Sequence, residues 1–180
     1  MDDFQQKFDK AILDYASKNQ YGVSRIPYHT HNGTDSPLVH PTSSDINARS
    51  YGTGVTSIVT GTPTKLTLQS NSFNNGVTWD STNNRLQIIT AGQYLITALV
   101  TYTNTTDAKG YQTLVYKNGG EIMAANMMAS AAGGAVSPVS TDIQTLATND
   151  YLELYTFHNA GVNQTVGSTT EQTYLAIAKV

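Results

Sequence analysis

The chain has 180 residues, enough for one domain with a substantial hydrophobic core and some additional segment. Only 13% of the residues are charged and the formal net charge is −3, which argues against a nucleic-acid-binding surface with clustered Lys and Arg. The absence of cysteine excludes disulfides and thiolate metal sites, and no apolar run approaches the roughly 20 residues of a membrane helix.

Residues 1–20 have the pattern of an amphipathic α-helix. Apolar residues recur at three- and four-residue spacings, as in the seam of a coiled coil: Phe4, Phe8, Ala11 and Tyr15. An isolated helix of this length is marginal in water, so we expect it to form a short trimeric stalk or to dock onto a larger assembly. Packing against its own domain is the alternative. The segment is acidic and unlike a secretory signal, so we expect display outside a cell to come from assembly into a virus particle.

Residues 21–60 are rich in Pro, Thr, Ser, Asn and Gly and lack hydrophobic periodicity, which predicts an extended collar. His29 and His31 are two residues apart, so in an extended strand both imidazoles point the same way. Three chains around an axis would bring together six imidazoles, two from each, which suits an octahedral transition metal. The alternative is that both histidines only form hydrogen bonds with Asn32, Asp35 or the backbone in a turn.

Residues 61–180 have the features of an all-β domain. Apolar residues fall largely at alternate positions, as expected for the buried face of a sheet: Leu66, Leu68, Val77, Trp79, Leu86, Ile88, Tyr94, Ile96, Ala98 and Val100. Turn-forming residues separate these runs at 74–76, 80–84 and 91–92.

Further strands are predicted at 112–117, 139–146, 151–155 and 173–180, with a hairpin turn at 118–120. Residues 124–134 are rich in Ala, Gly and Met and lack strand-forming side chains. We favour a loop for this run, with a close-packed subunit contact as the alternative.

The spacing of seven residues resembles the signature of the complement C1q-type globular head, a member of the tumour necrosis factor-like jelly rolls: Leu68, Asn74, Trp79, Leu86, Gly92, Tyr94 and Ile96. Asn74, Trp79, Gly92 and Tyr94 match the pattern, whereas the other three stand where the family usually has Phe. The resemblance implies an antiparallel β-sandwich jelly roll that packs as a homotrimer. The His-Thr-His sequence is similar to the His-x-His motif of trimeric bacteriophage tail fibres and spikes, which implies iron on the threefold axis.

No catalytic motif accompanies these features. The sequence has no Gly-x-Ser-x-Gly elbow, no His-Glu-x-x-His helix and no phosphate-binding glycine loop between strand and helix. We therefore expect a non-enzymatic trimeric structural protein at the virion surface: a tail fibre, head fibre or spike that attaches to the host. A cellular C1q-like or tumour necrosis factor-like ligand or lectin is the alternative, and a polysaccharide depolymerase is a distant third.

Two polar segments flanked by strands, 104–110 and 159–168, are the candidates for contact with a host receptor or glycan. Their candidate residues are Asn104, Asp107, Lys109, Asn159 and Asn163. We expect the N-terminal helix to contact other virion proteins instead.

Overall fold

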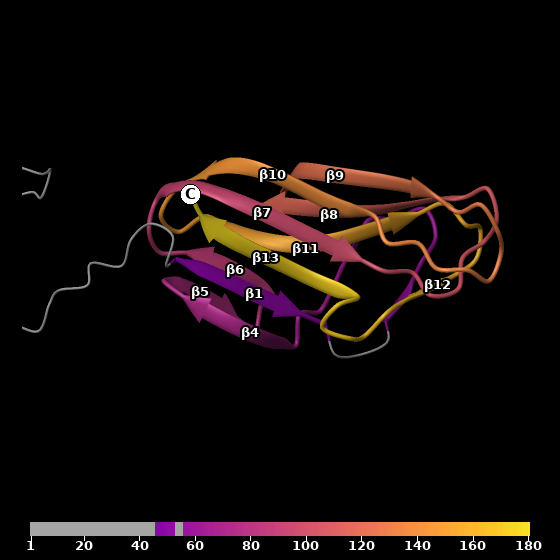
Figure 1. Ribbon diagram of the computed structural model, residues 1–180, viewed down its shortest axis with the longest axis horizontal. Helices are drawn as coiled ribbons and strands as arrows, with labels where there is room; N and C mark the ends of the chain where they lie inside the picture. Colours follow the sequence, from indigo (N-terminus) through magenta and orange to yellow (C-terminus); the bar gives the residue numbers. More distant parts are fainter. Residues whose placement is uncertain (1–45, 53–55) are drawn as a thin grey trace, which may run out of the picture. The chain divides into compact units, whose positions relative to one another are not determined.

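The computed structural model describes residues 46–52 and 56–180 of the chain. In these residues the regular structure is entirely β-strand, arranged in two large antiparallel sheets and one small sheet (Figure 1). The predicted stalk helix and the two collar histidines, His29 and His31, lie outside the described residues.

The first sheet has five strands. Their order is β10 (Val139–Leu146), β7 (Gly92–Val100), β13 (Thr173–Lys179), β1 (Asn47–Tyr51) and β4 (Ser70–Asn75). Every neighbouring pair is antiparallel, and the register between β1 and β4 shifts at one bulge. The strand that closes the chain, β13, therefore lies in the middle of this sheet.

The second sheet has six strands, with β3 placed beside β11. Its strands are β5 (Val77–Asp80), β6 (Arg85–Ile88), β11 (Tyr151–His158), β8 (Gly110–Lys117), β9 (Gly120–Met128) and β3 (Thr64–Lys65). A separate pair is formed by β2 (Thr56–Ile58) and β12 (Gln164–Val166).

The core lies between the two large sheets, and the alternation in the sequence predicts it well. The side chains predicted to be apolar and inward-facing are buried: Leu66, Leu68, Val77, Leu86, Ile88, Tyr94, Ile96, Ala98 and Val100. Trp79 is half-buried and packs against this cluster. The predicted strands at 139–146 and 173–180 are confirmed as β10 and β13.

A polar and aromatic cluster lies within this core. Tyr102, Tyr111 and His158 are fully buried, and their rings lie 4.7–5.9 Å apart between centroids. The Thr156 hydroxyl donates its only proton to the Gln112 carbonyl oxygen (2.6 Å). Thr156 Oγ1 must therefore accept the hydrogen bond that it shares with the Tyr102 hydroxyl (2.7 Å), which makes Tyr102 the donor. Burial raises the pKa of Tyr102. The hydroxyls are therefore satisfied inside the sandwich, as buried polar groups must be.

His158 has both ring nitrogens engaged by the backbone. The Ala160 N–H donates to Nδ1 (3.3 Å), so Nδ1 carries no proton and Nε2–H donates to the Ile58 carbonyl (3.0 Å). The strand predicted at 151–155 extends three residues further, so that His158 is the last residue of β11. Its role in the structure is to join β11 to β2.

The strand registers define two ends of the sandwich. At one end the described chain begins at Ile46, whose carbonyl accepts a hydrogen bond from the Lys179 N–H (2.8 Å). At the other end Val100 pairs with Thr173. We call them the Ile46 end and the loop end. Three long connections gather at the loop end, beside β12 in Figure 1: residues 101–109, 129–138 and 159–163.

Two segments differ from the sequence-based prediction. β1 and β2 lie before residue 61, inside the predicted collar, because the inward positions of β1 are the small residues Ala48 and Ser50 and give no apolar alternation. Residues 124–128 belong to β9, where the sequence favours a loop. Pairing with β8 supplies their backbone hydrogen bonds, and such pairing overrides weak strand propensity.

The buried hydroxyl pair generates a stability prediction. Tyr102→Phe removes one donor and should destabilise the fold by about 1 kcal/mol, whereas Thr156→Val strips partners from both Tyr102 and Gln112 and should cost about 2–3 kcal/mol. Urea unfolding at one fixed protein concentration measures both values. Tyr155→Phe, at a half-buried tyrosine on the outer face of the six-stranded sheet, is the control and should change stability by less than ~0.5 kcal/mol. Equal losses for Tyr102→Phe and Thr156→Val would contradict the assigned donor order.

Candidate functional site

The outer face of the five-stranded sheet is apolar. Residues directly opposite each other in antiparallel strands share a face, so the registers place three rows of side chains on the side away from the core. The rows are Val139, Leu99, Tyr174 and Tyr51; Thr141, Thr97, Ala176, Arg49 and Phe73; and Ile143, Leu95, Ala178 and Asn47. We call this surface the apolar face.

Several large side chains on the apolar face are open to solvent. Phe73 is 46% exposed, Leu95 38%, Val139 50% and Ile143 54%. Phe73 and Leu95 border a shallow hollow of about 450 Å³, whose lining also includes the small residue Ala176. A contiguous apolar surface with small residues at its centre and large ones around it is typical of a protein interface.

Arg49 is the one charged residue in these three rows. Its guanidinium lies 4.3 Å from the centre of the Tyr174 ring and donates hydrogen bonds to the Thr170 carbonyl and to Ser72 Oγ (3.3 Å). These contacts fix the position of the guanidinium, and a guanidinium stacked on an aromatic ring is readily accommodated in an interface.

Two exposed methionines end β9, and as consecutive strand residues they point to opposite faces of the sheet. Met127 is 42% exposed and Met128 is 63% exposed, and β9 is at the edge of its sheet, close to β10. Methionine has a flexible unbranched side chain that adapts to irregular surfaces. The two methionines at the β9 edge therefore have the chemistry to fill a hollow such as the one on the apolar face.

The loop end is held together by backbone hydrogen bonds between loops far apart in the sequence. Thr105 N–H donates to the Gly134 carbonyl (3.0 Å), and Gly133 N–H donates to the Thr105 carbonyl (2.8 Å). Ala108 N–H donates to the Ala129 carbonyl (3.0 Å). Ala108 has a φ of 54°, which costs a non-glycine residue about 1–2 kcal/mol and persists only where the surroundings enforce it.

Residues 159–163 join the same cluster. The Gly110 N–H donates to Asn159 Oδ1 (2.8 Å), and the Gly161 N–H donates to Thr60 Oγ1 (3.0 Å). The structure thus brings together the two segments that the sequence identifies as candidate receptor loops. It adds residues 129–138, which sequence reasoning missed because nothing local indicates which loops will be neighbours.

The five predicted loop residues fall into two groups. Asn104, Asp107 and Asn163 are exposed, and Lys109 is half-buried. Asn159 is also exposed, but its side-chain oxygen accepts the Gly110 bond and so positions the start of β8. The first group is suited to contact a partner, whereas Asn159 supports the loops.

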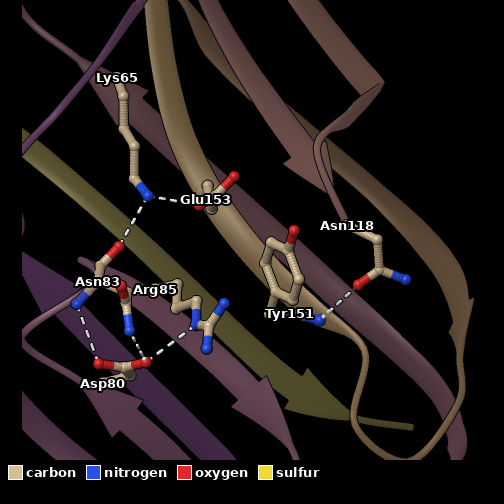
Figure 2. A network of polar contacts seen from close by, with 7 residues as sticks. All are labelled: Lys65, Asp80, Asn83, Arg85, Asn118, Tyr151 and Glu153. Atoms are coloured by element: carbon tan, nitrogen blue, oxygen red, sulfur yellow. Dashed lines mark hydrogen bonds and ion pairs between the residues drawn. The ribbon is translucent and has the colours of Figure 1, made fainter.

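The outer face of the six-stranded sheet is polar. Lys65 pairs with Glu153 and also donates to the Asn83 carbonyl (2.7 Å), and Asp80 pairs with Arg85 (2.9 Å), as Figure 2 shows. Hydrogen bonds from the side chain and N–H of Asn83, with a smaller effect of Arg85, lower the pKa of Asp80. The carboxylates of Glu153 and Asp80 therefore both form ion pairs, and that of Asp80 also stabilises the turn through Asn83.

The Asn118 turn at the Ile46 end is held in a similar way. Asn118 has a φ of 53° and its Oδ1 accepts the Tyr151 N–H (2.9 Å, Figure 2), while its Nδ2 donates to Asp150 (2.7 Å). The backbone N–H of Ala147, the Asn118 amide and, less strongly, Lys117 lower the pKa of Asp150. The hairpin predicted at 118–120 is confirmed.

The described residues do not bring together three or more His, Asp or Glu side chains in a way that suits a metal ion. They also include no helix long and apolar enough to span a membrane. Four signature residues, Leu68, Leu86, Tyr94 and Ile96, are buried in the core. Asn74 is instead exposed and accepts a hydrogen bond from Asn71 (2.8 Å), and Gly92 lies beneath the Lys179 side chain. The stalk residues Phe4, Phe8, Ala11 and Tyr15 lie outside the described part.

Comparison with known proteins identifies the fold. A scan against protein-family models finds no match, and a search of curated proteins finds none either. Among solved structures, the chain is similar to Eiger TNF from S. frugiperda, with a TM-score of 0.61 and 13% identity over 75% of this chain and 92% of that one. It is also similar to murine APRIL at pH 5.0, with a TM-score of 0.57 and 14% identity over 74% of this chain and 98% of that one. The predicted antiparallel jelly roll of the tumour necrosis factor type is confirmed.

Proposed function

We propose that the protein is a non-enzymatic structural protein of a bacteriophage particle: a homotrimeric tail fibre, head fibre or spike whose jelly roll attaches to the host surface. The observation that supports assembly and attachment is the division of the sandwich surface. The apolar face is suited to assembly between copies, and the loop end, which exposes Asn104, Asp107 and Asn163 far from Ile46, is suited to recognition.

Assembly into a closed ring needs two different, complementary patches on each copy. The hollow beside Phe73 and Leu95 offers one, and Met127 and Met128 on β9 offer the other. In the proposed trimer, the β9 edge of one copy fills the hollow of the next. The number three follows the resemblance to trimeric jelly rolls, and it is also the number that brings six collar imidazoles to one axis.

Recognition is proposed for the loop end because residues 1–45 connect to the sandwich at the Ile46 end. If those residues attach to other virion proteins, the loops point away from the particle, toward a host receptor or glycan. A polar surface on loops that are fixed to each other is suited to such binding.

A cellular C1q-like or tumour necrosis factor-like ligand or lectin is the second candidate, favoured by the likeness to Eiger TNF and APRIL. The same two surfaces serve it equally well. The choice of a bacteriophage rests on the His29-Thr30-His31 sequence in the collar. A polysaccharide depolymerase would need paired carboxylates beside a sugar, and release of reducing ends from host polysaccharide tests for it.

The trimer proposal predicts the effect of a charge on the apolar face. Ile143→Lys should weaken assembly at least about 30-fold, or about 2 kcal/mol, because it places an ammonium in a desolvated contact. Light scattering on the full chain should give three times the chain mass of 19.4 kDa for the natural protein, and a smaller mass for this variant at low micromolar concentration.

Ile89→Lys is the matched control, since Ile89 is 52% exposed and Ile143 54% exposed. Ile89 lies between β6 and β7, outside the three rows of the apolar face. A monomeric natural chain, or equal effects of the two substitutions, would contradict the proposed interface.

The recognition proposal predicts that host binding depends on the exposed loop residues. Replacing Asn104, Asp107 and Asn163 together by alanine should abolish binding of the labelled protein to host cells, while its mass and melting temperature stay unchanged. Flow cytometry on panels of bacterial strains and of cultured animal cells provides the measurement and separates the two candidate functions.

The matched control replaces three exposed residues toward the Ile46 end, Thr90, Gln93 and Thr148, by alanine. This variant should bind like the natural protein. Binding to animal cells alone would favour the cellular ligand, and loss of binding only in the control would place recognition at the opposite end.

We also propose that His29 and His31 hold a metal in the trimer, although both lie outside the described residues. Two imidazoles from each of three chains suit iron or another octahedral transition metal better than zinc, whose protein sites are usually tetrahedral. In the trimer the metal would link the three collars.

Elemental analysis of untagged protein should therefore find about one metal per three chains. His31→Ala should remove the metal and lower the melting temperature, whereas His40→Ala, outside the motif, should change neither. The site should empty as the pH falls below the histidine pKa of about 6.5, less any margin from metal affinity. A metal-free natural trimer with the same stability as His31→Ala would instead support histidines that only form hydrogen bonds.

A further inference from the structure

Four aromatic side chains lie among the polar groups on the outer face of the six-stranded sheet. Residues directly opposite each other in β8 and β11 share a face, and Val115 and Leu154 form one such pair in the core. The residues that alternate with them therefore face away from the core. We call the aromatic residues among them the aromatic strip: Tyr116, Tyr151, Tyr155 and Phe157. Each of these side chains is half-buried and so partly open to solvent.

Contacts on this face hold three of the four rings in place. Tyr116 and Tyr155 stack, with ring centroids 4.1 Å apart and planes inclined by 24°. The Arg85 guanidinium lies over the Tyr151 ring, 4.5 Å from its centroid, and donates a hydrogen bond to Asp80 (2.9 Å). Rings that are already fixed lose little conformational entropy when a ligand packs on them, which is why tyrosines are frequent in rigid binding surfaces.

The stacked tyrosines belong to a small apolar surface outside the core. Leu114 lies directly opposite Tyr155 on the outer face and is not part of the core cluster, yet it is only 2% exposed. Neighbouring side chains on the outer face must therefore cover it, and Tyr155 and Tyr116 are its neighbours by register. The two tyrosines and Leu114 thus form one packed apolar surface at the centre of the sheet.

Hydrogen-bonding side chains border this surface. Glu121 lies opposite Tyr116 and is exposed. Gln112 lies between Phe157 on β11 and Asn126 on β9, and Asn126 is exposed. Amide side chains both donate and accept hydrogen bonds, and a carboxylate accepts them. A ligand on the aromatic strip therefore finds apolar contact at the centre and both donors and acceptors beside it, as in small-molecule binding sites.

The charges on this face argue against an anionic ligand. Lys65, beside Tyr155, is paired with Glu153 (Figure 2), whereas Glu121 forms no ion pair with any residue that the structure describes. Because Lys65 and Glu153 neutralise each other, Glu121 leaves one carboxylate in excess beside the stacked tyrosines. A negative charge in that position repels nucleic acid or a sulfated polysaccharide.

A neutral saccharide has the properties that this surface matches. Its rings have apolar C–H faces that can pack on aromatic side chains, and its hydroxyls both donate and accept hydrogen bonds. We propose that the aromatic strip binds a neutral oligosaccharide, with the stacked tyrosines beneath the sugar and Glu121, Gln112 and Asn126 as its hydrogen-bond partners. The strip extends about 20 Å along β11, which is long enough to contact consecutive sugar rings. This face is separate from the loop end, so the site does not depend on the proposed function.

Binding of neutral oligosaccharides to the full chain tests the site. An array of neutral hexose and N-acetylhexosamine oligosaccharides identifies a sugar that binds, and isothermal titration measures its affinity. Tyr155→Leu should weaken binding about tenfold, because it removes the aromatic ring but keeps an apolar side chain beside Leu114. Glu121→Ala, at an exposed position where a change of fold is not expected, should weaken binding about threefold through loss of an acceptor.

Tyr51→Leu is the matched control, because Tyr51 is a half-buried tyrosine on the outer face of the other large sheet, and it should leave the affinity unchanged. The proposal is overturned if no neutral oligosaccharide binds at about 1 mM, if heparin binds more tightly than every neutral sugar, or if Tyr155→Leu and Glu121→Ala bind as well as the natural protein. An equal loss in Tyr51→Leu and Tyr155→Leu would also overturn it.

Host-cell binding separates this site from the proposed function. Oligosaccharide binding that Tyr155→Leu weakens, in a protein that binds no host cell, would support the aromatic strip and contradict the proposed attachment role. Host-cell binding that depends on Asn104, Asp107 and Asn163, in a protein that binds no neutral oligosaccharide, would contradict the aromatic strip alone.

Discussion

The sandwich depends on burial of the inner faces of two antiparallel sheets against each other, and strand alternation decides what remains outside. β7 and β13 each place one set of side chains in the core and the alternate set on the apolar face, so both sets are determined by the same register. A shift of one residue would exchange Ile96 for Leu95 in the core. The apolar face is therefore formed by the same strands that hold the fold together. Exposure of Leu95 and Phe73 to solvent does not stabilise the isolated domain.

Sequence alternation predicts the strands whose inward residues are large. Leu86 and Ile88 in β6, and Leu175 and Ile177 in β13, alternate clearly and are buried as expected. β1 is not predicted because its inward residues, Ala48 and Ser50, are too small to give an apolar alternation. The second half of β9 is not predicted because Ala, Asn and Met have little strand propensity of their own. Both strands exist because neighbours from distant parts of the chain supply their hydrogen bonds, and such neighbours cannot be identified from local sequence.

The candidate surfaces were accessible to sequence reasoning only in part. Polar segments between strands identify 104–110 and 159–168 as loops, but their meeting at one end depends on strand direction and on bonds such as Gly110 to Asn159. The apolar face depends on knowing which strands are adjacent, because Phe73, Leu95 and Ile143 are separated by tens of residues and share a surface only through the four strand registers of this sheet. Likeness to TNF-type structures supports the architecture, and at 13–14% identity it supports the fold alone.

The loop end combines a fixed backbone with free side chains. Thr105, Ala108 and Gly133 are joined across loops by main-chain hydrogen bonds, which do not depend on which side chains the loops carry, although Ala108 adopts a backbone conformation that costs energy. Asn104, Asp107 and Asn163 extend from this frame into solvent. A preformed backbone reduces the ordering entropy lost on binding, and substitutions at the exposed positions leave the frame intact. A surface of this kind can change its binding partner through a few exposed residues while the sandwich beneath it keeps the same core.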